Sequence, residues 1–552
     1  MEPIKQAVAR VVQELFGVEA GVELTRPAEQ FGDYATNVAL QLAGKLGKPP
    51  REIAEAIAGK LQDAAIAKAD VAGPGFINIT LSNGALAAAV GKATDKPQDY
   101  TGKTVVTEYS DPNPFKVLHA GHLYTSVVGD GIANLLENAG AAVHRVNFGG
   151  DVGLHVAKTM WAILQQLGGE NPGELAEVPE NDRAQWLSEA YITGTNAYED
   201  DESAKAQIID LNKRVYQIQN DGDHDSPLGQ IYWTTRQWSY DYFDKFYARI
   251  GSKFEKYIPE SEVAGLGLQT VREHVGTVFK ESDGAIIFDG EAHGLHTRVF
   301  INSEGLPTYE AKDVGLIERK WNDYHFDLSV VITGHEQEQY MAVVLKAIEQ
   351  FQPELAQKTR HFTHGLVKLQ GGVKMSSRKG NILRAEDILD EAAEANHAAR
   401  EKDDPDTVLG AVKYSFLKQR MGGDIIYDPN ESVSLEGNSG PYLQYAHARA
   451  RSILAKAGGA GGEMSDLQPG ERSLARKISE FPEVVGMATN ELMPHHICTY
   501  LYELAQNFNR FYEQNRVIGD ERQAARLQLV AHYADVLKAG LGLLGIVAPE
   551  HM

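Results

Sequence analysis

The sequence predicts an α/β protein built around a parallel β-sheet, and two observations in residues 104–151 support that prediction. A strand, a helix and a second strand follow one another with short joints, which is the pattern of a right-handed βαβ unit. Two histidines, His119 and His122, stand at the start of the helix, where parallel sheets bind ligands beyond the carboxyl ends of their strands. We therefore expect the ligand site to lie at this helix.

The parts of the unit follow from local pattern. Residues 104–109 are apolar and rich in β-branched side chains, which predicts a strand, and the Asp and Pro residues at 111–114 end it. Apolar residues recur at helical spacing over 119–138, and Gly140 stands just past the expected helix end. The apolar run 143–148 is the second strand.

The helix begins with the sequence HAGH. Free N–H groups at a helix start favour an anion, and Gly121 would let a ligand approach the backbone closely. His119 and His122 share one helical face and could both donate to a phosphate oxygen. The loop before them has neither a GxxxxGK[ST] nor a GxGxxG pattern. Two alternatives remain open: a metal pair, for which no third ligand is evident nearby, and two ordinary polar residues.

Composition fits a globular protein of three or four domains. The chain has 552 residues, of which 43% are hydrophobic and 23% charged. We find neither an apolar segment at the N-terminus nor a run of the ~18 residues that span a membrane. Cys498 is the only cysteine, which excludes an intramolecular disulfide and a cysteine-cluster zinc site, so we expect a cytoplasmic protein.

The charge is unevenly distributed. The net charge of −23 argues against wholesale coating by nucleic acid. Residues 1–90 carry −2 and residues 431–552 carry −3, so the remaining −18 falls in the middle of the chain. Both ends are nearly neutral and could meet RNA through local basic patches. The acidic run at 199–202 fits a solvated face.

Residues 1–90 have the pattern of a separate small domain. An amphipathic helix comes first, and residues 31–37 predict a turn into a second helix, with Asp33 or Thr36 as its cap. Residues 76–81 alternate as a strand, with Phe76 and Asn78 on one face. An exposed aromatic beside an amide could stack on and hydrogen-bond an RNA base. A half-buried strand without that role is the alternative.

Three later stretches add candidates. Residues 298–301 and 329–333 predict strands where the chain returns to the central fold, and Tyr309 and Asp313 share a face of the helix that opens after Pro307. Alone, that pair could be a helix-surface contact. Residues 371–380 form a glycine-flanked basic loop that could close over a polyphosphate, although a solvated charge cluster is the alternative. Apolar residues spaced by four and three over 497–511 predict a buried helix face in a helical C-terminal domain.

Several of these motifs resemble a known family. HAGH, preceded by SDPNPFK, resembles the HIGH signature of class I aminoacyl-tRNA synthetases, and of arginyl-tRNA synthetases in particular. KMSSRKG at 374–380 resembles the KMSKS loop, except that Ser377 replaces its second lysine. FGDYATNVAL and GPGFINITL resemble the appended N-terminal domain of that family, and GNSGPYLQYAHAR and LGLLGIVAPEHM resemble its anticodon-binding domain.

The resemblance implies a domain plan. A Rossmann-type class I catalytic domain would span 103–365, with an insertion at about 152–297 that matches the family weakly. An α+β appended domain that binds tRNA would precede it at 1–92. The KMSKS loop and a connecting region would follow at 366–430, and an all-α anticodon-binding domain at 431–552.

The resemblance also implies an activity and its residues. The reaction is activation of L-arginine by ATP, followed by transfer to the 3′-terminal adenosine of tRNA(Arg). Catalysis is assigned to His119, Gly121, His122, Lys116, Lys374, Ser376, Arg378 and Lys379. ATP binding is assigned to His119, Gly121, His122, His364, Leu366, Lys374 and Met375. Arginine binding is assigned to Glu108, Asn113, Tyr309, Asp313 and Gln337. Binding of tRNA is assigned to Phe76, Asn78, Tyr442, Arg449 and Arg510.

Some consequences stay open at this stage. Lys116, three residues before His119, stands where some arginyl enzymes carry the lysine that their KMSKS loop lacks. How the catalytic role of that lysine is divided among Lys116, Lys374, Arg378 and Lys379 is therefore undecided. Which of Glu108 and Asp313 meets the guanidinium group is also undecided. We expect Mg²⁺ to arrive with ATP, no protein-held metal, no membrane association, and a monomer. The alternatives are another HxGH nucleotidyl transferase or a non-catalytic RNA-binding paralogue.

Overall fold

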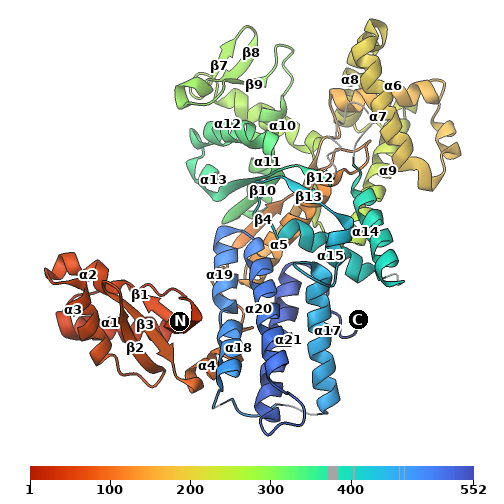
Figure 1. Ribbon diagram of the computed structural model, residues 1–552. Helices are drawn as coiled ribbons and strands as arrows, with labels where there is room; N and C mark the ends of the chain where they lie inside the picture. Colours follow the sequence, from red (N-terminus) through yellow and green to blue (C-terminus); the bar gives the residue numbers. More distant parts are fainter. Residues whose placement is uncertain (371–382, 402–403, 459–460, 465) are drawn as a thin grey trace.

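The structure, a computed structural model, describes the chain except for residues 371–382, 402–403, 459–460 and 465. A small N-terminal domain stands to one side of a long helical bundle, and the central sheet lies at the upper end of that bundle (Figure 1). None of the helices in the described ranges combines the length and the apolar character that a bilayer span requires.

The N-terminal domain is a three-stranded antiparallel sheet with helices packed on it. The strand order is β1-β3-β2. Its elements are α1 (Glu2–Phe16), β1 (Tyr34–Thr36), α2 (Val38–Leu46), α3 (Pro50–Lys60), β2 (Ile66–Ala72), β3 (Phe76–Leu81) and α4 (Asn83–Gly91). The predicted alternation in β3 is confirmed, because Ile77 and Ile79 are fully buried whereas Phe76 is 41% exposed.

The predicted turn at 31–37 is wrong in part. Tyr34–Thr36 forms β1, which pairs with β3. The residue before α2 is Asn37, whose own side chain makes no cap, but the Thr36 hydroxyl accepts the N–H of Val38, the first residue of α2, at 3.3 Å. Asp33 instead accepts a hydrogen bond from the backbone N–H of Leu81 at 2.7 Å. The local pattern is that of a turn, and the pairing with β3 depends on a segment some forty residues away, which local pattern does not reveal.

The centre of the molecule is a five-stranded parallel sheet with the strand order β11-β10-β4-β5-β6. The strands are β4 (Thr104–Glu108), β5 (Ala142–Gly149), β6 (Lys256–Pro259), β10 (Leu328–Gly334) and β11 (Thr359–His364). Helix α5 (Ala120–Asn138) connects β4 to β5, and these two strands pair in parallel. The predicted βαβ unit is therefore confirmed.

Both faces of this sheet are covered, as expected for parallel strands. Val105 and Val330 pack in the same core as α5, whereas Val106 and Val331 pack in the core on the opposite face. That second core contains α10 (Glu260–Glu273), α11 (Tyr309–Tyr324) and α12 (Glu338–Glu349), and α13 (Pro353–Lys358) follows them. Alternate residues of each strand thus serve different layers.

The range expected as one insertion, 152–297, is divided. A helical block comes first: α6 (Leu154–Gln166), α7 (Arg183–Asp200), α8 (Glu202–Asp221) and α9 (Pro227–Ile250). The chain then returns to the sheet in β6, a four-residue edge strand that pairs with β5. The predicted strand at residues 298–301 is confirmed, but it lies outside the parallel sheet. This strand, β9 (Arg298–Ile301), pairs antiparallel with β8 (Ala285–Phe288), which pairs with β7 (Phe279–Ser282).

The remainder is mainly helical. Strands β12 (Val367–Leu369) and β13 (Ile425–Tyr427) pair in parallel. The helices are α14 (Ala385–Arg400), α15 (Pro405–Leu417), α16 (Pro429–Ser432), α17 (Gly440–Ala457), α18 (Pro469–Ser479), α19 (Phe481–Glu491), α20 (His495–Gln514) and α21 (Gln523–Leu543). The predicted buried face of α20 is confirmed, since Ile497, Leu501, Leu504, Phe508 and Phe511 are all buried.

Candidate active site

The two histidines of HAGH cap the helix that they begin. His119 is the N-cap residue of α5, and its Nδ1 accepts the N–H of Gly121 at 3.1 Å. Nδ1 of His122 accepts the N–H of His119 at 3.0 Å, and the two rings are stacked with centroids 3.7 Å apart. The N–H groups of Ala120 and His122 donate to the carbonyls of Leu383 and His119. The prediction that free N–H groups hold an anion here is therefore wrong, because all of these donors have partners within the protein.

The same bonds determine which ring nitrogens face a ligand. Each Nδ1 accepts a backbone N–H, so the neutral ring carries its proton on Nε2. Burial, together with the smaller effects of neighbouring Lys116 and His364, lowers the pKa of His119 to about 3. Burial holds the pKa of His122 well below its ordinary value, and the neighbouring His119 and Lys116 act in the same direction. Both histidines are thus neutral donors through Nε2–H.

Gly121 is required by this cap. A β-carbon at Gly121 would lie 2.9 Å from Cε1 and 3.0 Å from Nδ1 of His119. His364, from the end of β11, lies beside the same position, because its Cε1 would be 3.9 Å from that β-carbon. The His364 ring also packs edge-on against Tyr124 of α5, at 4.7 Å between centroids. The structure therefore brings His364 to the HAGH motif.

Lys116 lies in the loop before α5, with its Nζ 5.6 Å from the ring centroid of Tyr191. No carboxylate of the described residues forms an ion pair with it. Burial lowers the pKa of the Lys116 ammonium group. Tyr191 comes from α7 of the helical block, and no local motif marks it in the sequence. A desolvated cation without a carboxylate partner is suited to an incoming anion.

The two acidic residues expected to bind arginine have different hydrogen-bond partners: a lysine for Glu108 and a tyrosine for Asp313. Glu108, at the end of β4, accepts a hydrogen bond from Lys320, whose side chain is fully buried. Asp313 accepts a hydrogen bond from Tyr340. Burial raises the pKa of Asp313 to about 7, against the lowering effect of the Tyr340 hydroxyl. Sequence reasoning identified neither Lys320 nor Tyr340.

Asn113 is held in one orientation. Its Oδ1 accepts the N–H of Gly150 at 2.7 Å, so its NH₂ group remains to donate. On the other side of Gly150, Nε2 of His155 donates to the Gly150 carbonyl at 2.8 Å. Burial lowers the pKa of His155 to about 3, which keeps its ring neutral. His155 was missed from sequence, although it follows the Gly149-Gly150-Asp151 end of β5 by only a few residues.

Tyr309 and Asp313 lie one turn apart at the start of α11, with Tyr309 54% exposed and Asp313 buried. Gln337 is exposed in the turn after β10. No hydrogen bond among the described residues joins Gln337 to Asp313 or Glu108. Tyr309 and Asp313 therefore lie one turn apart on α11, and Gln337 lies three residues before Tyr340, which donates to Asp313.

Lys374, Met375, Ser376, Arg378 and Lys379 lie outside the described residues. The segments that flank them do meet the site. The N–H of Ala120 donates to Leu383, and the N–H of Ala385 donates to Leu118, so the chain after the gap pairs with the HAGH segment. On the other side, Leu366 is 47% exposed and its N–H donates to Asp424 at 2.8 Å. Among the described residues, no group of three or more His, Cys, Asp or Glu side chains is placed to hold a metal ion.

Three family models together match almost the whole chain. The arginyl tRNA synthetase N terminal domain matches residues 2–81, the class I (R) tRNA synthetase catalytic domain matches 85–427, and the DALR anticodon binding domain matches 443–552. The chain belongs to the arginyl-tRNA synthetases. It is an ATP-dependent arginine–tRNA ligase, and the resemblance seen in the motifs is confirmed.

Individual proteins agree with this assignment. An arginine–tRNA ligase of Bdellovibrio bacteriovorus is 30% identical, with 100% of this chain and 98% of the relative covered. One from Bacteroides fragilis is 28% identical over 97% of this chain and 96% of the relative. The arginyl-tRNA synthetase structure from Thermus thermophilus has a TM-score of 0.81 and 27% identity, with both chains fully covered.

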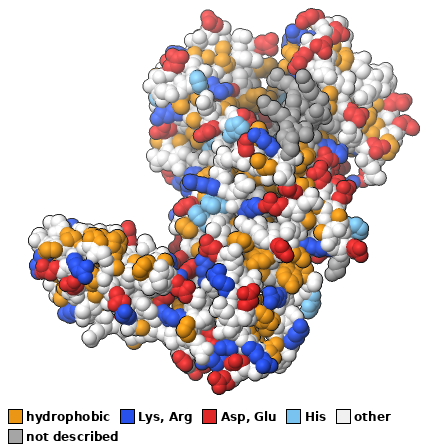
Figure 2. All heavy atoms as spheres, viewed as in Figure 1, with side chains coloured by type: hydrophobic (Ala, Val, Ile, Leu, Met, Phe, Trp, Pro, Cys, Tyr) orange, Lys and Arg blue, Asp and Glu red, His pale blue; other side chains and the backbone are white. Residues whose placement is uncertain are grey.

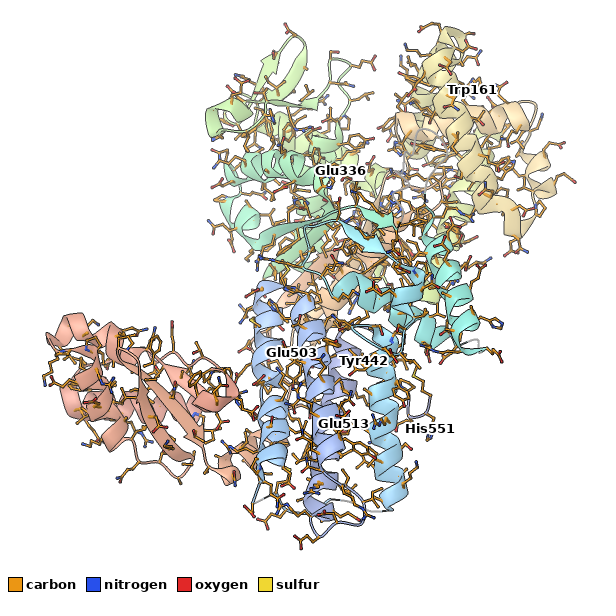
Figure 3. The ribbon with its side chains drawn as sticks, in the orientation of Figure 1. Trp161, Glu336, Tyr442, Glu503, Glu513 and His551 are labelled. Carbon is orange, nitrogen blue, oxygen red and sulfur yellow. The ribbon has the colours of Figure 1, made fainter. Side chains whose placement is uncertain are left out.

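The candidate tRNA-binding residues of the synthetase form two separate groups. Phe76 and the half-buried Asn78 lie on the outer face of β3. Tyr442, Arg449 and Arg510 lie on the helical bundle, along which Figure 3 labels Tyr442 far from Glu336 at the sheet. Arg449 stacks over the Tyr512 ring at 4.7 Å, Tyr442 accepts from Asn509 at 2.9 Å, and Arg510 is exposed.

Basic and acidic side chains are interspersed on the visible face of both regions (Figure 2). This mixture agrees with the nearly neutral charge of the two chain ends.

Proposed function

We propose that the synthetase activates arginine at the site formed by the HAGH motif, Lys116 and the carboxyl ends of β4 and β10. A carboxylate oxygen of arginine attacks the α-phosphorus of ATP, and the bond to the bridging oxygen breaks to release pyrophosphate. A ribose hydroxyl of the terminal adenosine of tRNA then attacks the adenylate carbonyl and releases AMP. Positioning and charge stabilisation account for most of the rate in such transfers.

The observation that carries this proposal is the double histidine cap. Nδ1 of His119 accepts the N–H of Gly121 and Nδ1 of His122 accepts the N–H of His119, so each ring keeps Nε2–H as a donor. Donors that are already oriented stabilise the charge of a phosphoryl transition state without reorganisation. Neutral rings suit this task, because they neither exchange protons with ATP nor repel Lys116. Gly121 contributes by leaving room for the His119 ring.

The leaving pyrophosphate is assigned to cations. Lys116 has no carboxylate partner among the described residues and lies before the HAGH helix. Lys374, Ser376, Arg378 and Lys379 would join it from the basic loop, whose downstream end pairs with the HAGH segment. Met375, His364 and Leu366 would line the adenine site, and Mg²⁺ would neutralise phosphate charge as it arrives with ATP.

Arginine binding is assigned to Glu108, Asn113, Tyr309, Asp313 and Gln337. Asp313 has no cationic partner among the described residues, whereas Glu108 is paired with Lys320. Asp313 is therefore the carboxylate that is better able to accept the guanidinium or ammonium group. The free NH₂ group of Asn113 suits the arginine carboxylate, since its oxygen is engaged by Gly150.

Two further parts of the proposal concern tRNA and the whole chain. Phe76 and Asn78 would contact one part of tRNA(Arg), and Tyr442, Arg449 and Arg510 another. The domain boundaries proposed are 92, 103, 365 and 431, with β6 as a strand of the catalytic sheet. We also assign the synthetase to the cytoplasm as a monomer.

The test is ATP–pyrophosphate exchange with each of the twenty amino acids, with and without tRNA. Exchange with arginine alone among them, with or without a requirement for tRNA, supports the site. Exchange with another amino acid would contradict the assignment of Asp313 and Asn113. Absence of exchange with active tRNA present would favour a non-catalytic paralogue.

A further inference from the structure

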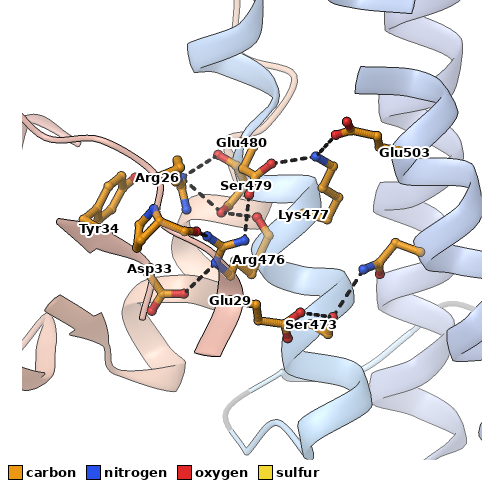
Figure 4. Close-up of polar contacts among 12 residues, drawn as sticks. Arg26, Glu29, Asp33, Tyr34, Ser473, Arg476, Lys477, Ser479, Glu480 and Glu503 are labelled. Carbon is orange, nitrogen blue, oxygen red and sulfur yellow. Dashed lines mark hydrogen bonds and ion pairs between the residues drawn. The ribbon is translucent and has the colours of Figure 1, made fainter. Parts of the chain in front are cut away.

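The N-terminal domain meets the helical bundle through charged side chains. Figure 4 shows side chains of residues 26–34 facing those of α18 and Glu480, the residue that follows α18. Arg476 of α18 donates to the carbonyl of Pro27 at 2.6 Å, and Ser473 donates to Glu29 at 3.0 Å. This contact joins the two candidate tRNA-binding regions, which are far apart in the sequence.

Asp33 is the first centre of this junction. Its side chain is almost fully buried and accepts hydrogen bonds from Arg472 of α18 and from the N–H of Leu81. Nε of Arg476 lies 3.7 Å from its other carboxylate oxygen. Leu81 is the last residue of β3, the strand that begins at Phe76. One carboxylate therefore connects the end of the Phe76 strand to the bundle.

Arg26 and Glu483 form the second centre. The Arg26 guanidinium donates to both carboxylate oxygens of Glu483, each at 2.9 Å. The hydroxyl of Tyr34, in β1, donates to the same carboxylate at 2.8 Å. The side chains of Arg26 and Glu483 are 14% and 23% exposed, so this pair is largely shielded from solvent. A two-pronged pair of this kind restrains orientation as well as distance.

We propose that these two centres, which we call the interdomain lock (Arg26, Asp33, Glu483, Arg472 and Arg476), position Phe76 and Asn78 relative to the anticodon helices. This inference rests on the proposed function, in which those two residues contact tRNA. A rigid link between two contact regions raises the effective concentration of the second once the first is bound, and it avoids the cost of ordering a loose domain. The five residues of the lock are positioning residues that do not themselves need to touch tRNA.

The variant that tests the lock is Glu483→Arg, which places an arginine opposite Arg26. We expect the Kd for tRNA to rise about tenfold, because a loosened link loses effective concentration. The kcat at saturating tRNA should stay within about twofold of the parent, since the lock is remote from the phosphate chemistry. The swapped pair Arg26→Glu with Glu483→Arg should recover most of the affinity. Arg10→Glu, which breaks the exposed Arg10–Asp63 pair within the N-terminal domain, is the matched control.

An interdomain distance gives a readout that does not depend on tRNA. Cys498 is the only cysteine and is buried, so spin labels at Lys45→Cys and Glu513→Cys can be attached selectively. Both positions are exposed, one on α2 and one on α20. Glu483→Arg should broaden the distance distribution, and the swapped pair should narrow it again. An unchanged distribution together with an unchanged Kd would overturn the lock.

Phe76→Ala separates failure of the lock from failure of the proposed tRNA contact. If the lock acts by positioning Phe76, the loss of affinity from Phe76→Ala should be smaller in the Glu483→Arg background than in the parent. Fully additive losses would overturn the positioning role. Phe76→Ala could leave the Kd for tRNA unchanged while Glu483→Arg still broadens the distance distribution. That result would contradict the proposed tRNA contact of Phe76 and would support the link between the two domains.

Discussion

At the residue scale, the signature histidines divide their ring nitrogens between folding and chemistry. Nδ1 of each ring closes the start of α5, and Nε2–H is left to donate. The functional side of this arrangement follows from the sequence HAGH, but the folding side does not. Histidine is not a common N-cap residue, so the pattern gave no reason to expect a cap.

Replacement of His122 by alanine tests this division. The variant loses the acceptor for the His119 N–H and the Nε2–H donor, and adenylate formation should fall by about 10²-fold or more, as for loss of one preorganised donor. Single-turnover adenylate formation is the measurement, with thermal unfolding to confirm the fold. His144→Ala on β5, whose ring pairs with Glu255, is the control. Near-parental activity of the His122 variant would remove this ring from the mechanism.

The pKa of Asp313 predicts how arginine binding depends on pH. Burial raises this pKa to about 7, so the carboxyl group loses its proton, and gains its charge, as pH rises through 7. Arginine stays cationic throughout, so its KM should fall about tenfold between pH 6 and pH 8 if only the ionised form binds.

The variant that checks this pH profile is Asp313→Asn, which should bind arginine weakly at every pH. Asp323→Asn on the same helix, at a residue paired with Lys256 and Arg319, should keep the parental profile. The measurement is the KM for arginine at saturating ATP, taken across the pH range for both variants. A profile in Asp313→Asn that still falls through pH 7 would assign the titration to another group.

At the scale of elements, sequence pattern predicts a helix or strand correctly when the residue spacing within that segment is enough to define it. The β4–α5–β5 unit, the alternation in β3 and the apolar face of α20 follow from spacing alone. β1, β6 and the sheet containing β9 are different, because each of their strands is only three or four residues long, and β1 and β6 pair with strands far along the chain. Short edge strands carry little periodicity, so tertiary pairing decides them.

The same reasoning explains the parts of the site that were missed. Lys320, Tyr191 and Tyr340 lie in ordinary helical sequence, and each acquires its role through a neighbour that the fold supplies: Glu108, Lys116 or Asp313. No spacing rule relates residues that are more than two hundred positions apart, as Lys320 and Glu108 are. Motifs therefore locate the site, and tertiary contacts determine which of its charges are free.

Gly121→Ala tests the start of α5 as an element. Alanine favours a helix over glycine by about 1 kcal/mol, but its β-carbon would lie 2.9 Å from the His119 ring. We expect the unfolding temperature to stay near the parental value and pyrophosphate exchange to fall at least about tenfold as the ring is displaced. Gly542→Ala on α21, where a β-carbon meets open space, should leave activity unchanged. Parental activity in Gly121→Ala would show that the His119 ring tolerates displacement.

At the scale of the whole molecule, the end of the chain joins the catalytic and anticodon parts. Asn134 of α5 donates to the Leu543 carbonyl at 3.3 Å, and Lys413 of α15 donates to Gly545 at 2.9 Å. Gln444 of α17 donates both to Val547 at 2.9 Å and to Asp406, at the start of α15, at 3.1 Å. Three elements thus hold main-chain carbonyls at or just after the end of α21, so the helix that begins with HAGH is hydrogen-bonded near its far end to the last anticodon helix.

Gln444→Leu tests that joint. Gln444 is fully buried, and leucine of similar size would leave the carbonyls of Asp406 and Val547 without their donor. An orphaned Val547 carbonyl costs about 1–3 kcal/mol, whereas the Asp406 carbonyl lies in the first turn of α15 and keeps its place in the hydrogen bonding of that helix. Part of this is offset, because the Oε1 of Gln444 has no hydrogen-bond partner and its removal relieves a buried polar atom. The expected result is an unfolding midpoint lower by several degrees, with adenylate formation at low temperature unchanged because the active site is untouched.

Gln41→Leu, on the exposed face of α2, is the control and should leave the unfolding midpoint unchanged. An equal midpoint for both variants would mean that the catalytic and anticodon parts are held together by their apolar contacts alone.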